Sequence, residues 1–180
     1  MKSLLILAGV ASTLTAAPSV RSHAPRPPTS ISTSQITEET IPIVFVNAHR
    51  PAAIAFETRL LTFDLNVERA KRGVPALTRD ADLDRIAYAK GVDMAAHSYF
   101  GHTDPAGVTF QDRMRAAHWT TEYVAENIAF DRNEKAANLA FVNSPGHYAN
   151  MIDPNERRVG VAVITVGRGE TFYVQVFSGG

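Results

Sequence analysis

A β-hairpin pattern near the C-terminus limits the possible folds more than any other feature of this sequence. Residues 159–164 read VGVAVI, and residues 171–177 read TFYVQVF. Between them, residues 167–170 (GRGE) have the composition of a turn. Side chains of a strand alternate between its two faces, and in 159–164 both alternating sets are apolar. Such a strand must be covered on both faces. Because the helical patterns come first and the strands come late, the sequence predicts an α/β/α sandwich.

Helices are predicted from apolar spacing and capping residues. The first begins near Pro51 and ends before Gly73, and its apolar stripe consists of Phe56, Leu60, Phe63, Val67 and Ala70. The second begins behind Asp80, a suitable N-cap, and its inward residues are Leu83, Ile86, Ala87 and Met94. Thr109 and Asp112 form a capping box for the third. We also expect a strand over 121–130 and a helix over 134–142.

The chain divides into three predicted segments. Residues 1–19 read as a secretory signal peptide, with Lys2 before an apolar run and small residues near the cleavage zone. Residues 20–50 form a linker rich in Pro, Ser and Thr. Within it, 41–47 (IPIVFVN) resemble a short strand, which Pro42 would confine to the edge of a sheet. Residues 51–180 form the predicted folded domain.

The composition narrows the class of protein. The 180 residues have a formal net charge of zero, so no basic field favours nucleic acid as a partner. No apolar run approaches the ~20 residues that a transmembrane helix needs. Cysteine is absent, so the fold depends on its core and has no disulfide framework. These properties predict a secreted bacterial protein, extracellular or periplasmic, without a transmembrane segment.

Two histidines and a glutamate stand in distinct contexts: His102 in SYFGHTDPAG, Glu126 in YVAENIAF and His147 in NSPGHYANM. Glu126 interrupts a run from Tyr123 to Phe130 that is otherwise expected to be buried. A buried carboxylate loses much of its hydration, so it must be paired or protonated. We therefore expect one of the two histidines to pair with it. The alternative is a β-bulge that turns Glu126 towards water.

His147 is predicted to lie in the first turn of a helix. Ser144 is suited to the N-cap position and Pro145 to the first helical position. The positive end of the helix dipole would lower the pKa of His147, and a neutral imidazole can serve as a metal ligand or general base. The alternative for His147 is that it is exposed and has no role in a site. The alternative for His102 is that it is a solvated loop residue without a function.

Established catalytic motifs are missing from the sequence. Ser144 is a poor nucleophile candidate because no GxSxG elbow surrounds it. HExxH, CxxC, P-loop and GxGxxG patterns are also absent. His97 and His118 stand near predicted helix ends and are expected at the surface.

Five segments in order resemble the superfamily of cysteine-rich secretory proteins, antigen 5 and pathogenesis-related-1 proteins, in its cysteine-free bacterial form. They are LNVERAKRGVPAL, LDRIAYAKGVDMAAHSYFGHTDPAG, AENIAF, NSPGHYANMIDPNERRVGVAV and FYVQVF. The resemblance covers about 56–179, which is nearly all of the predicted domain. It implies an α+β fold, a three-layer α/β/α sandwich with a mainly antiparallel central sheet. This agrees with the layers predicted from the hairpin.

The resemblance also implies a central cavity built from two histidines and two acidic residues. His102, Glu126 and His147 occupy three of these positions. Ser144 stands near the place of the second acid, Phe141 replaces the usual tryptophan, and Ala125 replaces the glycine that commonly precedes the first glutamate. Members of the family are mostly secreted. Some bind a divalent cation such as zinc through the two histidines, and some bind sterols, lipids or other proteins.

Three interpretations of the cluster stay open. In the first, His102, Glu126, His147 and Ser144 form a cavity for a small molecule, a lipid or an extracellular protein, and His102 and His147 can hold zinc or another divalent cation. In the second, Glu126 is the catalytic residue of a hydrolase acting on extracellular or cell-envelope material, with a metal or a histidine activating water. In the third, Glu126 is a structural acceptor that fixes two loops. The missing motifs favour a binding domain over an enzyme.

Overall fold

The computed structural model describes residues 51–180, so the predicted signal peptide, the linker and the strand expected at 41–47 lie outside the described residues. In chain order the elements are α1 (Pro51–Lys71), β1 (Thr78–Arg79), α2 (Ala81–Ala96), α3 (Phe110–Ala116), β2 (Val124–Asp131), α4 (Glu134–Asn143), α5 (Pro145–Ile152), β3 (Glu156–Thr165), η3 (Gly167–Gly169) and β4 (Thr171–Gly179).

One four-stranded sheet in the order β1-β3-β4-β2 forms the centre of the domain. The C-terminal hairpin is present as predicted, and β3 and β4 pair antiparallel with Val161 opposite Gln175. β2 pairs antiparallel with the other side of β4, whereas the short β1 runs parallel to β3. The prediction of a mainly antiparallel sheet is therefore confirmed.

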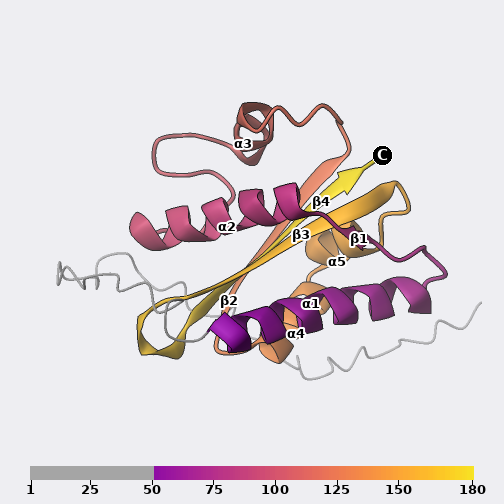
Figure 1. Cartoon of the computed structure of the whole chain (residues 1–180), viewed down its shortest axis with the longest axis horizontal. Helices are drawn as coiled ribbons and strands as arrows, with labels where there is room; N and C mark the ends of the chain where they lie inside the picture. The colour runs from indigo at the N-terminus through magenta and orange to yellow at the C-terminus, as the bar shows by residue number, and fades with distance from the viewer. Residues whose placement is uncertain (1–50) are drawn as a thin grey trace, which may run out of the picture. The chain divides into compact units, whose positions relative to one another are not determined.

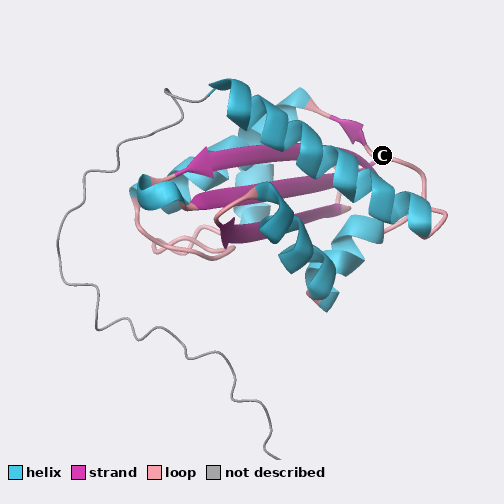
Figure 2. Cartoon of the chain, turned by 90° about the horizontal axis from the view of Figure 1, so that it is seen from below, coloured by secondary structure: helices cyan, strands magenta, loops and turns pink. Residues whose placement is uncertain are grey.

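Helices cover both faces of this sheet, so the domain has three layers (Figures 1 and 2). On one face, α1, α4 and α5 bury a core cluster with Val159, Val161 and Val163 of β3. On the other face, α2 and α3 bury a second cluster with Ala162 and Ile164. The two apolar faces of β3 thus supply two separate cores, as the pattern at 159–164 predicted.

The predicted caps fix the starts of the helices. Asp80 accepts hydrogen bonds from the backbone N–H groups of Asp82 and Leu83 at the start of α2. Thr109 and Asp112 form the complete capping box of α3. α5 begins with Pro145 behind Ser144, although the Ser144 hydroxyl makes no capping hydrogen bond.

The predicted buried stripe of α1 is wrong. Phe56 and Phe63 are 55% and 65% exposed, whereas Leu61 and Leu65 are fully buried. α1 carries two apolar stripes at helical spacing, and the packed one also contains Arg69, which is fully buried. Arg69 donates to the carbonyl oxygens of Pro75, Met151, Asp153 and Glu156, so its guanidinium ties the end of α1 to α5 and β3.

α2 lies unusually close to β3. A Cβ atom added to Gly160 would overlap backbone atoms of Leu83, and one added to Gly91 would overlap the side chain of Ile164. Glycine at these positions allows the helix and the strand to approach each other. This contact fixes the position from which the chain leaves α2 towards His102.

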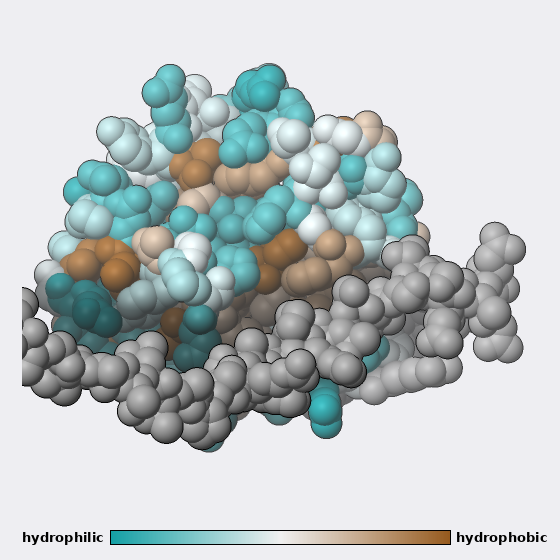
Figure 3. Space-filling model, turned by 180° about the vertical axis from the view of Figure 1, so that it is seen from behind, coloured by the Kyte–Doolittle hydropathy of each residue, from teal (hydrophilic) through white to brown (hydrophobic). Residues whose placement is uncertain are grey.

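No helix within 51–180 is long and apolar enough to cross a membrane. The surface is mixed, and on the face shown in Figure 3 apolar areas are separated by polar ones. Tyr123 and Phe130, predicted to be buried, are 60% and 41% exposed. The Phe130 ring nevertheless packs on Phe172, with ring centroids 4.7 Å apart.

Candidate functional site

Glu126 lies in a regular part of β2, and its side chain is only 1% exposed. Pairing with β4 is continuous from Val124 to Asp131, so the bulge alternative is wrong. The residue stands opposite Val176, which belongs to the core beneath α2 and α3. The strand therefore directs a carboxylate towards this layer, as its alternation with Val124 and Ile128 predicted.

His102 pairs with Glu126. Its Nδ1 lies 2.9 Å from Oε1 of the glutamate, while the His102 side chain is 51% exposed. An ionised carboxylate can only accept, so Nδ1 of His102 donates the proton in this hydrogen bond. When the imidazole is neutral, its Nε2 keeps a free lone pair. The pairing thus fixes a tautomer that can bind a metal or accept a proton through Nε2.

Two cations hold the backbone of His102. Its carbonyl oxygen accepts from Arg113 of α3 and from Nζ of Lys90 at 3.5 Å. Lys90 is fully buried and also donates to the Tyr99 hydroxyl at 2.9 Å. Burial lowers the pKa of Lys90, and the negative charge of Glu126 opposes that shift. The loop that carries His102 is therefore anchored to both α2 and α3.

The sequence interpretation missed Lys90. The residue lies on the buried stripe of α2 at helical spacing from Leu83, Ala87 and Met94. A lysine on an apolar stripe indicates a buried partner, because a buried charge must be paired. This signal was present in the sequence.

His147 lies in the first turn of α5, as predicted, and is partly buried. Burial lowers its pKa, and the positive charge that His102 carries when protonated adds to that shift. The direction agrees with the prediction, but its main cause is burial, not the helix dipole. The ring makes an edge contact with Phe141 at 5.4 Å between ring centroids. No hydrogen bond within 51–180 links it directly to His102 or Glu126.

A buried amide network connects α5 to the sheet beside Glu126. Asn127 Nδ2 donates to the carbonyl oxygen of His147 and to Gln175 Oε1, both at 3.1 Å. Asn150 donates to Asn127 Oδ1 at 2.9 Å. Asn127 and Gln175 are fully buried. The network fixes the backbone of His147 relative to β2, and it was not predicted from the sequence.

A cavity of about 230 Å³ opens beside the His102–Glu126 pair. β2, the loop after α2, the start of α3 and α5 line it, and its polar lining includes His102, Thr103, Thr109, Gln111, Glu126 and Asn150. The second carboxylate oxygen of Glu126, Oε2, is buried and has no hydrogen-bond partner within 51–180. A buried acceptor without a partner suits a ligand that brings a donor or a positive charge.

Ser144 lies between α4 and α5, partly buried, and its carbonyl oxygen accepts from the N–H of Tyr148 at 2.8 Å. The residues that line the cavity include neither Ser144 nor His147. The roles of both in ligand binding stay predictions. Within 51–180, no three His, Asp or Glu side chains are close enough together to hold a metal ion. His97 and His118 are exposed, as predicted.

Known proteins share this sequence and architecture. Residues 62–177 match the model of the CAP family, described as the cysteine-rich secretory protein family. The uncharacterized protein YkwD of Bacillus subtilis is 31% identical over 126 residues, which cover 69% of this chain and 48% of YkwD. The chain therefore spans about half the length of this curated relative.

Solved structures agree with the sequence match. An extracellular protein of Bacillus anthracis with an SCP domain superposes with a TM-score of 0.66 at 25% identity, over 74% of this chain and 43% of that one. An outer surface protein of Borrelia burgdorferi superposes with a TM-score of 0.63 at 19% identity, over 67% and 90% of the two chains. With the family match and the three-layer fold, these similarities show that the chain belongs to the CAP family, the cysteine-rich secretory proteins, as a cysteine-free member of bacterial type.

Proposed function

We propose that this protein is a secreted binding domain whose cavity beside His102 and Glu126 takes a small ligand, with a divalent cation such as zinc as part of the site. The observation that carries the proposal is the buried Oε2 of Glu126, which has no partner within 51–180 while Oε1 orients His102. Glu134 Oε1 and Glu156 Oε2 are also buried without a partner within 51–180, but of these three carboxylates only Glu126 lines the cavity, where a ligand can supply the donor.

Two features of the histidines support the cation in this proposal. Glu126 leaves Nε2 of His102 available, and the lowered pKa of His147 favours its neutral form, which a metal ligand needs. His102 and His147 would hold the ion, and Glu126 would orient His102 from behind. When bound, zinc would supply a Lewis acid for a ligand oxygen. Two histidines leave coordination positions open, so we expect moderate affinity and a fold that does not depend on the metal.

Export fits the two structural relatives, one of which is an extracellular protein and the other an outer surface protein. The predicted signal peptide at 1–19 supports the same location. Small molecules, lipids and extracellular proteins are the classes of partner that we consider for the cavity.

A hydrolase is the second candidate, favoured by the same pair of residues. A histidine oriented by a buried carboxylate is the arrangement of a general base, and Nε2 of His102 would accept a proton from water. The cavity hydroxyl of Thr109 is not free to act as nucleophile, because it donates to Asp112 at 2.6 Å. In this candidate function, water would be the nucleophile.

Histidine NMR during a zinc titration tests the proposal. We expect the ring signals of His102 and His147 to shift together, and those of the exposed His97 and His118 to stay in place. Equal shifts of all four rings would indicate nonspecific binding and contradict the proposed site. If a ligand shifts the NMR signals of cavity residues alone, and does so without zinc, the cavity is a binding site that does not need the cation.

A further inference from the structure

Within 51–180, most of β3 has no neighbouring strand on the side away from β4, which we call its outer edge. β3 covers Glu156–Thr165, but its outer neighbour β1 contains only Thr78 and Arg79. These two residues pair with Arg158 and Val159. Beyond Val159 the edge has no neighbouring strand within 51–180.

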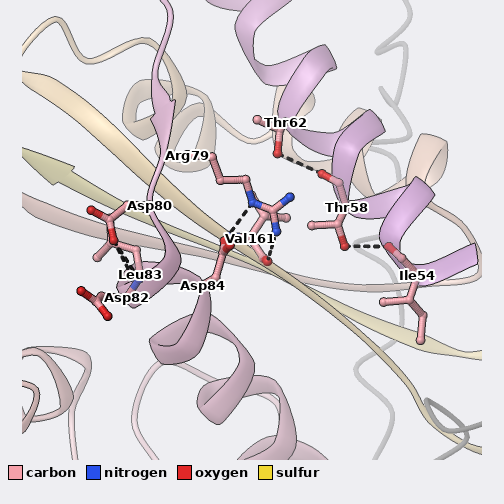
Figure 4. A network of polar contacts seen from close by, with 9 residues as sticks. All are labelled: Ile54, Thr58, Thr62, Arg79, Asp80, Asp82, Leu83, Asp84 and Val161. Atoms are coloured by element: carbon pink, nitrogen blue, oxygen red, sulfur yellow. Dashed lines mark hydrogen bonds and ion pairs between the residues drawn. The ribbon is translucent and has the colours of Figure 1, made fainter. Parts of the chain in front are cut away.

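Two side chains replace the missing strand at Val161 (Figure 4). The Val161 N–H donates to Asp84 Oδ1 at 2.8 Å, and its carbonyl oxygen accepts from Arg79 Nη2 at 3.2 Å. The Val159 carbonyl oxygen accepts from the N–H of Asp80 on the same side. Backbone groups therefore point outwards at Val159, Val161 and, by alternation, Val163.

Val163 lacks such partners. The residue is 2% exposed, but no hydrogen bond within 51–180 reaches its outward N–H or carbonyl oxygen. Buried peptide groups are nearly always paired. The outward N–H and carbonyl oxygen of Val163 therefore offer a donor and an acceptor to a segment outside the described residues.

An apolar groove of about 310 Å³ runs along this edge between α1 and α2. Its lining includes Ile54 and Thr58 of α1, Tyr88 of α2, and Val161 and Val163. Thr58 donates back to the carbonyl oxygen of Ile54 at 2.7 Å, so this wall offers no free hydroxyl proton (Figure 4). A strand placed here would have a helix on each face, and such strands are apolar on both faces.

The segment 41–47 has this composition. Residues 43–46 read IVFV, an unbroken apolar run of β-forming residues, and Pro42 limits the strand to the edge of a sheet. A strand added outside β3 would be an edge strand. This occupant also brings its own N–H and carbonyl groups to Val163.

The length and direction of the chain fit as well. α1 runs antiparallel to β3, because Ile54 near its start lines the groove with Val163, whereas Arg69 near its end contacts Glu156. Residues 48–50 can span about 10 Å. A strand parallel to β3 would end beside the start of α1, within this reach, whereas an antiparallel strand would end too far along β3. We propose that residues 41–47 dock in this groove as a strand parallel to β3 and pair with Val163.

Hydrogen exchange of single amides tests this in the full chain without its signal peptide. V44D/V46D places two charges in the docking segment, and I31D/I36D places two in the preceding linker as a matched control. We expect V44D/V46D to raise the exchange rate of the Val163 amide about tenfold or more, with the Val174 amide of β4 unchanged. The control should leave both rates unchanged.

Unchanged exchange at Val163 in V44D/V46D would overturn the proposal, and so would equal acceleration at Val163 and Val174. Protection of Val163 that persists in V44D/V46D and increases with protein concentration would assign the edge to a second copy of the chain instead.

Discussion

Nδ1 of His102 lies 2.9 Å from Oε1 of Glu126. The His102 side chain is 51% exposed, whereas the Glu126 side chain is only 1% exposed. The protein thus fixes an accessible imidazole from behind with a buried carboxylate. Orientation of this kind is common where a ring must present its other nitrogen to a metal or ligand. Variants of Glu126 can separate this role from a structural one.

Glu126→Gln should weaken zinc binding by about 10- to 100-fold, because the amide keeps the volume of the side chain but removes the charge that orients His102. We expect the melting temperature to change little, as measured by circular dichroism beside calorimetric titration. Glu122→Gln, at an exposed position near the start of β2, is the matched control. A large fall in melting temperature with unchanged zinc affinity would favour the structural interpretation.

Glu134 should make stability depend on pH. Burial, together with the nearby Asp64, raises the pKa of Glu134 to about 7 from 4.5. Between these pH values the folded state holds a proton that the unfolded state releases, so the free energy of unfolding falls as pH rises from 4.5 through 7. Glu134→Gln should remove this dependence and gain on the order of 2 kcal/mol relative to the wild type at about pH 8.

Urea unfolding at several pH values measures this difference, with the exposed Glu170→Gln as control. The pKa of Glu156 is also raised to about 7, chiefly by burial, but it contributes equally to both proteins and cancels in the comparison. Parallel pH profiles for the wild type and Glu134→Gln would contradict the assignment.

Arg69→Met should be strongly destabilising. The buried guanidinium donates to four backbone carbonyl groups, and methionine would leave them unpaired beside the buried Glu156. The expected loss is about 3–5 kcal/mol in the free energy of unfolding by urea denaturation. The exposed Arg59→Met provides the comparison. A loss below about 1 kcal/mol would show that water replaces the guanidinium.

His118→Gly should stabilise the domain. His118 has φ 55° after the end of α3, where its N–H donates to the carbonyl oxygen of Arg115 and the Trp119 N–H to that of Met114. This Schellman motif favours glycine, so the gain should be about 0.5–1 kcal/mol in thermal unfolding. Ala116→Gly, inside the helix, should lose a similar amount. The same sign for both variants would refute the explanation.

The sequence alone predicted the parts of the fold that depend on local patterns. The two apolar faces of 159–164 predicted the covered sheet, and Asp80 and Thr109 marked helix starts because capping is a short-range interaction. Glu126 was found because a charge in a regular strand has a predictable direction.

The missed features depend on distant partners. Which of the two apolar stripes on α1 is buried depends on α5 and β3, because their carbonyl groups accept hydrogen bonds from Arg69. Likewise, the burial of Lys90 depends on Tyr99 and the His102 carbonyl, which the loop after α2 brings back. Spacing within a single helix places Lys90 on the buried stripe but does not identify the partners that it contacts.

Zinc titration by calorimetry of the chain without its signal peptide tests the proposed site most directly, comparing the wild type, His102→Ala/His147→Ala and the exposed control His118→Asn. We expect micromolar binding, of order 10⁻⁶ M, to the wild type and the control, and its loss in the double variant. Equal binding to all three proteins, or none to the wild type, would contradict a cation site at His102 and His147.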